Sequence, residues 1–203
     1  MKNVSDRLNR LAESATLAMA RMSRELKAEG HDIIALSLGE PDFDTPQFIK
    51  QAAKQAIDDN FSHYTPVPGL LSLREAICQK FKRDNNLDFT PEQIVTSTGA
   101  KQSLANLCLS LLNPEDEVLL PCPFWVSYAE IIKLAEAIPV EIPSSIARDY
   151  KVSAQQLEAA ITPKTKLLMF SSPCNPSGTV YTQQELEEIA KMLEKYPHIY
   201  IVS

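Results

Sequence analysis

The sequence predicts an α/β fold with a three-layer αβα architecture, in which helices wrap both faces of a mostly parallel β-sheet. Strand-like and helix-like runs alternate along most of its 203 residues. The run KLLMF (166–170) is apolar without a two-residue alternation, which is typical of a parallel strand covered on both faces. No internal repeat or flexible linker interrupts this alternation, so one sheet is expected to organise the chain.

Helices are predicted from capping residues and from apolar side chains spaced three and four residues apart. A helix over 14–29 ends at Gly30, which suits the left-handed position after a helix. Thr45 is expected to cap a helix over 44–59, with Pro46 in its first turn. Further helices are expected over 70–81, 104–111, 127–137 and 185–196, the last behind a capping box of Thr182 and Glu185.

Short apolar runs between these helices are the expected strands. They are QIVTS (93–97), EVLLP (117–121), IPVEIP (138–143), KLLMF and HIYIVS (198–203), with DIIALSL (32–38) as a further extended run.

Composition narrows the class of protein. With 44% hydrophobic and 23% charged residues, the chain reads as an ordinary soluble globular protein. Its net charge of -6 argues against nucleic acid or an anionic membrane as the main partner. No signal peptide or membrane-length apolar run is present, so we expect a cytoplasmic location. The four cysteines are scattered without metal-ligand spacing and are expected to be reduced thiols, with no metal site.

Ligands of parallel sheets bind outside the carboxyl ends of the strands, which makes three loops candidates. In TGAKQ, the small residues Gly99 and Ala100 let backbone N–H groups at a helix N-terminus close around an anion such as a phosphate. A glycine needed only for a tight turn is the equally weighted alternative. Lys101 favours the anion site, because a cation in the first turn opposes the helix dipole and calls for another use.

The other two loops each carry one side chain suited to a planar ligand. Trp125, the only tryptophan, lies in PCPFWVSY and could stack on a heteroaromatic ring, although a core aromatic that pins the loop is an equal alternative. Asn175 in SPCNPSG could donate its amide to a ring oxygen, whereas bonding its own turn is the usual role of asparagine there. Together the three loops predict a site for a phosphorylated aromatic cofactor.

Five ordered segments resemble the class I aminotransferases, and most closely the bacterial aspartate aminotransferases of that class. They are SLGEPDFDTP (37–46), HYTPVPGLLSLREAI (63–77), TSTGAKQSL (96–104), PFWVSY (123–128) and SSPCNPSGTVY (171–181). The resemblance runs from about residue 14 to the last residue. It implies pyridoxal 5'-phosphate as cofactor, with 1–45 as an N-terminal helical arm and part of a small domain, and 46–203 as the first part of the large cofactor-binding domain.

The resemblance also implies roles for single residues. Gly99, Ala100 and Lys101 match the turn that holds the cofactor phosphate, Trp125 matches the ring-stacking residue, and Asn175 matches the asparagine that bonds the pyridoxal oxygen. Tyr64 matches the tyrosine that reaches the phosphate in the neighbouring subunit, which implies a homodimer with shared active sites.

Substrate contacts are implied in the same way. Gly39 matches the backbone group that meets the α-carboxylate of the substrate. The resemblance implies that Lys101 binds the distal carboxylate of the substrate, with a serine placed like Ser14 as a further contact. Trp125 and Asn175 face the substrate as well as the cofactor in this family.

Two departures from the family pattern stand out. Cys174 replaces the first asparagine of the usual N-P-N-N-P-T-G segment. The lysine that forms the Schiff base with the cofactor matches no residue within 1–203 and is expected beyond Ser203. We therefore expect the chain to be the truncated first half of an enzyme, with no catalytic residue of its own and no activity alone.

The predicted function of the complete protein is transfer of an amino group from aspartate, or a similar amino acid, to a 2-oxo acid such as 2-oxoglutarate. The alternative is another enzyme that shares this cofactor and fold: a prephenate or aromatic aminotransferase, a lyase or a cyclopropane-forming synthase. A non-catalytic fragment or binding module is the third reading.

Overall fold

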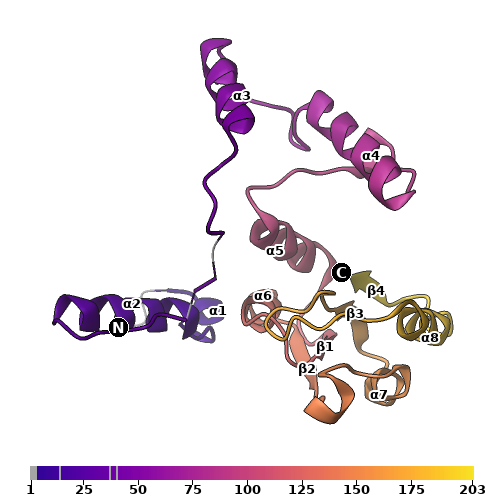
Figure 1. Ribbon diagram of the computed structural model, residues 1–203. Coiled ribbons are helices and arrows are strands. Elements are labelled where there is room, and N and C mark those ends of the chain that lie inside the picture. The colour runs from indigo at the N-terminus through magenta and orange to yellow at the C-terminus, as the bar shows by residue number, and fades with distance from the viewer. Residues whose placement is uncertain (1–3, 14, 37, 40) are drawn as a thin grey trace. The chain divides into compact units, whose positions relative to one another are not determined.

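The computed structural model describes residues 4–13, 15–36, 38, 39 and 41–203 (Figure 1). The chain divides into two compact units, one of residues 1–22 and 104–203 and one of residues 23–103. The predicted division at residue 45 concerns the arrangement of domains in the whole protein and stays a prediction.

The first unit is built on a four-stranded sheet in which every pairing is parallel. Its strands are β1 (Glu117–Pro121), β2 (Ile138–Ile142), β3 (Thr165–Met169) and β4 (Tyr200–Val202), in the order β2-β1-β3-β4. Leu119 pairs with Val140 on one side and with Leu168 on the other. The prediction of a mainly parallel sheet is confirmed.

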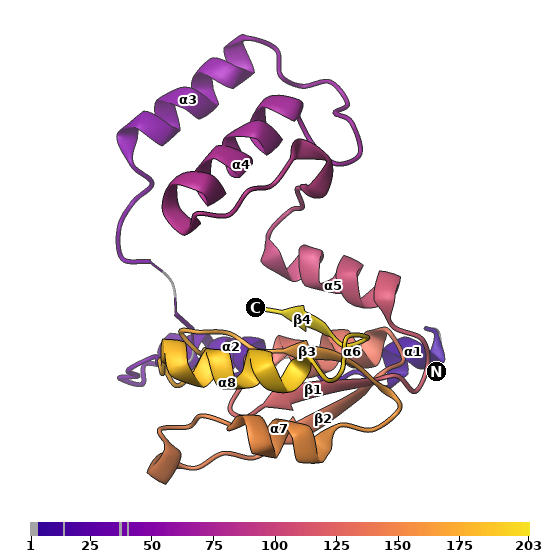
Figure 2. The same cartoon turned by 90° about the vertical axis from the view of Figure 1, so that its right-hand side faces the viewer.

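Helices cover both faces of this sheet, as Figure 2 shows. Val118, Leu120, Leu167 and Met169 face α5 (Ala100–Leu111) and α6 (Ser127–Leu134). On the opposite face, Leu119 and Leu168 pack with residues of α7 (Ala154–Ala160) and α8 (Gln183–Leu193). Successive strand residues point to opposite faces, so an uninterrupted apolar strand supplies both cores. The three-layer αβα architecture is therefore confirmed.

The N-terminal segment lies against α6. It contains α1 (Asp6–Asn9) and leads into α2 (Ala15–Ala28). The guanidinium of Arg7 lies 3.2 Å from the carboxylate of Glu136, and the N–H of Ala12 donates to Glu130 Oε2 at 2.9 Å. The helix predicted over 14–29 is confirmed at its described residues, and Gly30 has the expected positive φ of 92°. Neither α1 nor α7 was predicted.

The second unit contains α3 (Gln47–Asp58), α4 (Leu71–Asn85) and the short 3-10 helix η1 (Pro91–Gln93). None of its described residues forms a β-strand, so the strand predicted at QIVTS (93–97) is wrong. The Thr96 N–H donates to Pro68 O in a loop instead of to a strand. The expected Thr45 cap is also wrong, because Pro46 has an extended ψ of 143° and occupies the N-cap position itself.

Cys108 illustrates the depth of the first unit's core. Its side chain is 0% exposed on α5, and burial raises the pKa of its thiol to about 11. The neutral thiol therefore contributes stability that is complete below about pH 9, the ordinary value, and is lost as the pH rises through 11.

We expect iodoacetamide at pH 8 to alkylate Cys108 at least about a hundredfold more slowly in the folded chain than in urea, because both burial and the raised pKa suppress the thiolate. Mass spectrometry of the Cys108 peptide measures the two rates, and the half-buried Cys78 serves as the internal comparison. Equal rates for Cys108 in the two conditions would contradict this packing.

Candidate functional site

Trp125 lies in the loop that joins the carboxyl end of β1 to α6. Its indole is half-buried and packs edge-on against Tyr128, with ring centroids 5.6 Å apart and an interplanar angle of 88°. The carbonyl of Trp125 also accepts the N–H of Tyr128 at 2.9 Å. Tyr128, in the first turn of α6, thus packs against the indole of Trp125 at the carboxyl end of β1.

Asn175 is exposed in the loop between β3 and α8. The loop turns back on itself, because the N–H of Cys174 donates to Thr179 O at 2.9 Å and the N–H of Gly178 donates to Cys174 O at 2.7 Å. Ser177 and Thr179 add a bond between their hydroxyl groups at 2.8 Å. Asn175 lies inside this closed turn, with its side chain open to solvent.

The loops of Trp125 and Asn175 meet at one edge of the sheet. β1 and β3 are parallel neighbours, so their carboxyl ends lie at the same edge. The thiol of Cys174 donates to Pro123 O at 3.2 Å and joins the two loops directly. A small hollow between them is lined by Pro121, Pro123, Phe124, Tyr150, Phe170, Ser171, Cys174 and Tyr181. Cys174, the residue that departs from the family pattern, therefore has a structural use that the sequence did not reveal.

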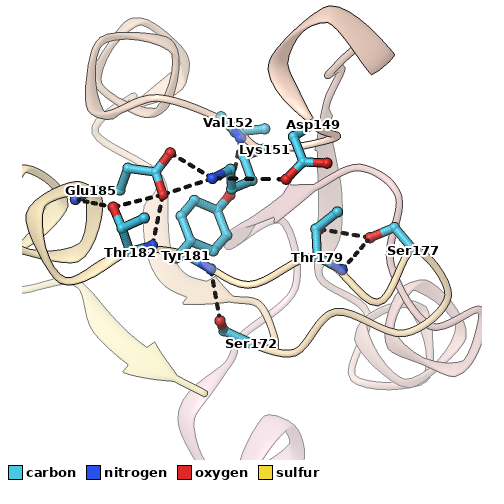
Figure 3. A network of polar contacts seen from close by, with 9 residues as sticks. All are labelled: Asp149, Lys151, Val152, Ser172, Ser177, Thr179, Tyr181, Thr182 and Glu185. Carbon is cyan, nitrogen blue, oxygen red and sulfur yellow. Dashed lines mark hydrogen bonds and ion pairs between the residues drawn. The ribbon is translucent and has the colours of Figure 1, made fainter.

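Tyr181 lies at the end of the loop that carries Asn175, and Figure 3 shows its contacts with Ser172 and Val152. Its N–H donates to Ser172 Oγ at 3.0 Å, and its phenol oxygen accepts the N–H of Val152 at 3.0 Å. The side chain is 8% exposed and packs edge-on against Phe170, and burial raises the pKa of its phenol. These contacts anchor the carboxyl end of the loop that carries Asn175.

The loop then enters α8 through a complete capping box. Thr182 Oγ1 accepts the N–H of Glu185, while the Glu185 carboxylate accepts the N–H of Thr182 at 2.7 Å. Lys151 Nζ lies 2.8 Å from Glu185 Oε1, and this contact holds the pKa of that carboxyl below its usual range (Figure 3). The predicted pairing of Thr182 with Glu185 is confirmed.

Replacing Thr182 by alanine is expected to lower the free energy of unfolding by about 1 kcal/mol, because the first turn of α8 loses its side-chain acceptor. Urea denaturation of the chain measures this change. The same substitution at the exposed Lys191 of α8 is the control and should change stability by less than about 0.5 kcal/mol. Equal effects at the two positions would contradict the capping role.

Gly99, Ala100 and Lys101 form the turn that starts α5, in the second unit. Gly99 has a φ of +82°, and a Cβ placed there would meet nothing within 4 Å. Its carbonyl accepts the N–H groups of Gln102 and Ser103 at 3.1 and 3.3 Å. Ala100 and Lys101 therefore hold the first two helical positions, whose N–H groups an α-helix does not use internally. An open turn of this kind fits an anion such as a phosphate.

The remaining predicted residues are placed as follows. Tyr64, in the loop between α3 and α4, is fully exposed, and Gly39 is exposed with open space around it. Both belong to the second unit. Ser14 lies outside the described residues. The structure thus brings together, in the first unit, the two loops that carry Trp125 and Asn175, while the convergence of all these residues on one ligand stays a prediction.

Two searches of the described residues found nothing further. No group of three or more histidine, cysteine, aspartate or glutamate side chains among them is arranged to hold a metal ion. No helix in the same part of the chain is long and apolar enough to cross a membrane.

Comparison with known proteins identifies the family. The aminotransferase class I and II family matches residues 31–203. The chain is 47% identical over its full 203 residues to an aspartate/prephenate aminotransferase of Cereibacter sphaeroides, of which it covers 51%. It is similar to the crystal structure of the aspartate aminotransferase from Rhizobium meliloti, with a TM-score of 0.94, 38% identity, and coverage of 98% of this chain and 50% of that one.

The Thermus thermophilus aspartate aminotransferase with maleate is equally similar, with a TM-score of 0.94 and 39% identity, covering 99% of this chain and 52% of that one. The chain spans about half the length of the curated relatives it matches. These matches confirm the resemblance read from the five sequence segments: the chain belongs to the class I and II aminotransferase family.

Proposed function

We propose that the whole protein is a pyridoxal 5'-phosphate-dependent aminotransferase that moves the amino group of aspartate, or a similar amino acid, to 2-oxoglutarate. The observation that carries this proposal is the meeting of two loops at one edge of the sheet, where Cys174 bonds Pro123 and the loops carry Asn175 and Trp125. Family membership supplies the reaction class.

The chain offers a contact for each part of the cofactor. The N–H groups of Ala100 and Lys101, in the turn that Gly99 begins, would hold the phosphate, and the ammonium of Lys101 would add positive charge there. The indole of Trp125 would stack on the ring, and the amide of Asn175 would donate to the ring oxygen. When bound, the cofactor withdraws electrons from the α-carbon of the amino acid, which is the hard step of the reaction.

Substrate recognition is proposed for the same residues and their neighbours. The backbone N–H of Gly39 would bind the α-carboxylate, and Lys101 with Ser14 would bind a distal carboxylate, near Trp125 and Asn175. A dicarboxylate as substrate is supported by the similar Thermus enzyme, which is described with maleate, itself a dicarboxylate.

A homodimer with shared active sites is part of the proposal, and so is a cytoplasmic location. The fully exposed Tyr64 would reach the cofactor phosphate of the neighbouring subunit. Large apolar side chains of the second unit are also exposed, as expected of a surface that other parts of the assembly cover. They are Ile34, Leu36, Phe43, Phe48, Ile57, Phe61 and Val67.

Prephenate is the second candidate for the amino-group acceptor. The curated relative from Cereibacter sphaeroides is named for both aspartate and prephenate, which favours a dual specificity. Product analysis with aspartate as donor, and 2-oxoglutarate or prephenate as acceptor, distinguishes the two.

A spectral titration tests the proposed function. The whole protein, loaded with pyridoxal phosphate, should change its cofactor absorbance when aspartate or glutamate is added alone, because the amino group passes to the cofactor. The 203-residue chain by itself is proposed to give no such change, since no residue within it matches the lysine that the family uses. A whole protein that binds the cofactor but shows no change with either amino acid would contradict the proposal.

A further inference from the structure

Hydrogen bonds tie two loops of the second unit together. The carbonyl of Pro68, in the loop that carries Tyr64, accepts two bonds from Thr96: one from its N–H at 3.0 Å and one from its hydroxyl at 3.2 Å. Thr96 lies three residues before Gly99. The Tyr64 loop is therefore bonded directly to the segment that leads into the Gly99 turn.

Arg74, in the first turn of α4, adds a second connection. Its Nε donates to Gly69 O at 3.2 Å, and its Nη1 donates to Pro91 O at 2.7 Å. The guanidinium is half-buried, and its planar fork places both donors at once. Arg74 thus links the end of the Tyr64 loop to the start of the segment 91–99. We call Arg74, Thr96 and the three carbonyls that they bond the Arg74–Thr96 clamp.

Gly69 shows how closely the two segments approach at the clamp. It is buried, with a φ of +101°, and a Cβ placed on it would lie 2.0 Å from Thr96 Oγ1. Only glycine gives this approach, because any side chain would collide with Thr96 and would strain the backbone as well.

The chain between the clamp and each functional residue is short and constrained. On one side, Pro66 and Pro68 restrict the backbone after Tyr64, and the N–H of Gly69 donates to Pro66 O at 2.8 Å. On the other side, the N–H of Gly99 donates to Ser97 O at 2.9 Å, and Gln102 Oε1 accepts the N–H of Thr98. Displacement of one segment is therefore transmitted to the other.

We propose that Arg74 and Thr96 are positioning residues that make the Tyr64 loop and the Gly99 turn move as one body. This inference rests on the proposed function, in which the turn of Gly99, Ala100 and Lys101 holds the cofactor phosphate of its own subunit and Tyr64 that of the neighbouring subunit. The clamp then couples the two active sites, because loosening of one phosphate contact loosens the contact that the same subunit makes across the dimer.

Hydrogen exchange in the 203-residue chain tests the clamp without any cofactor. In Thr96→Val and in Arg74→Met, the backbone amide at position 96 should exchange about tenfold faster or more, because the loop that accepts its bond is released. Thr96→Ser keeps the hydroxyl and should preserve the protection, and Arg83→Met, which changes an exposed arginine of the same helix, should leave it unchanged. Unchanged exchange in both Thr96→Val and Arg74→Met would overturn the clamp.

Cofactor release from the whole protein tests the coupling. Thr96→Val should release pyridoxal phosphate about threefold to tenfold faster. Tyr64→Phe should also speed release, and the effect of Thr96→Val should shrink in the Tyr64→Phe background if the clamp acts through Tyr64. Purely additive effects would mean a merely structural role and would overturn the coupling.

The two proposals fail in different ways. If the unaltered whole protein binds no pyridoxal phosphate, the proposed function fails and the coupling fails with it, whatever the exchange results. If it binds the cofactor and release is unchanged in Thr96→Val and Arg74→Met, the positioning role alone is overturned.

Discussion

Replacing Asn175 by alanine is expected to weaken the binding of pyridoxal phosphate to the whole protein about tenfold to a hundredfold. In the proposed site the amide would donate to an oxygen that carries negative charge, and hydrogen bonds to charged groups contribute about 1.5–3 kcal/mol. The turn around Asn175 is closed by main-chain bonds of Cys174 and Gly178, so the substitution should remove the donor and leave the loop in place.

Equilibrium titration followed by cofactor absorbance measures this loss. Asn106→Ala is the matched control, because Asn106 is exposed on α5, and its variant should bind the cofactor as the unaltered protein does. An Asn175→Ala protein with a native circular dichroism spectrum and unchanged affinity would remove Asn175 from the site.

Replacing Leu168 by alanine is expected to lower the free energy of unfolding by about 2–5 kcal/mol. Leu168 is the fourth of the five residues of β3, is 1% exposed, and belongs to the core beneath α7 and α8. The variant loses the free energy gained by burying the removed apolar atoms, and it also carries the cost of the cavity that they leave. It is a large share of the total of about 5–15 kcal/mol that is typical of folded domains.

Urea denaturation of the chain measures the effect of Leu168→Ala. Ile146→Ala removes the same number of carbon atoms from a side chain that is 78% exposed, and its effect should stay within about 0.5 kcal/mol. Equal losses at the two positions would contradict the burial of Leu168 in the core between β3 and the helices α7 and α8.

The helices and strands could be predicted where a short stretch of sequence is enough to specify them. EVLLP, IPVEI and KLLM are short apolar runs next to helical segments, and each forms a strand. QIVTS contains more β-branched residues than EVLLP or KLLM but pairs with no strand, because composition does not report whether a neighbouring strand exists. The helix α7 was missed although its capping box was readable, since Ser153 stands three residues before Gln156.

The candidate site could be predicted only in part, for a related reason. Gly99, Trp125 and Asn175 stand out because a glycine turn, a lone tryptophan in a loop and an asparagine between constrained residues are visible in the sequence. The bonds that hold their loops are long-range: Tyr181 bonds Val152 across 29 residues, and Cys174 bonds Pro123 across 51. No local pattern specifies such partners, so only the structure reveals them.

Transfer of isotope from one substrate to another tests the central claim most directly. The whole protein with pyridoxal phosphate, ¹⁵N-labelled aspartate and 2-oxoglutarate should yield ¹⁵N-labelled glutamate, detected by mass spectrometry, and the Asn175→Ala variant should yield less at limiting cofactor. A folded, cofactor-loaded protein that leaves the label on aspartate, with 2-oxoglutarate or with prephenate as acceptor, would contradict the account.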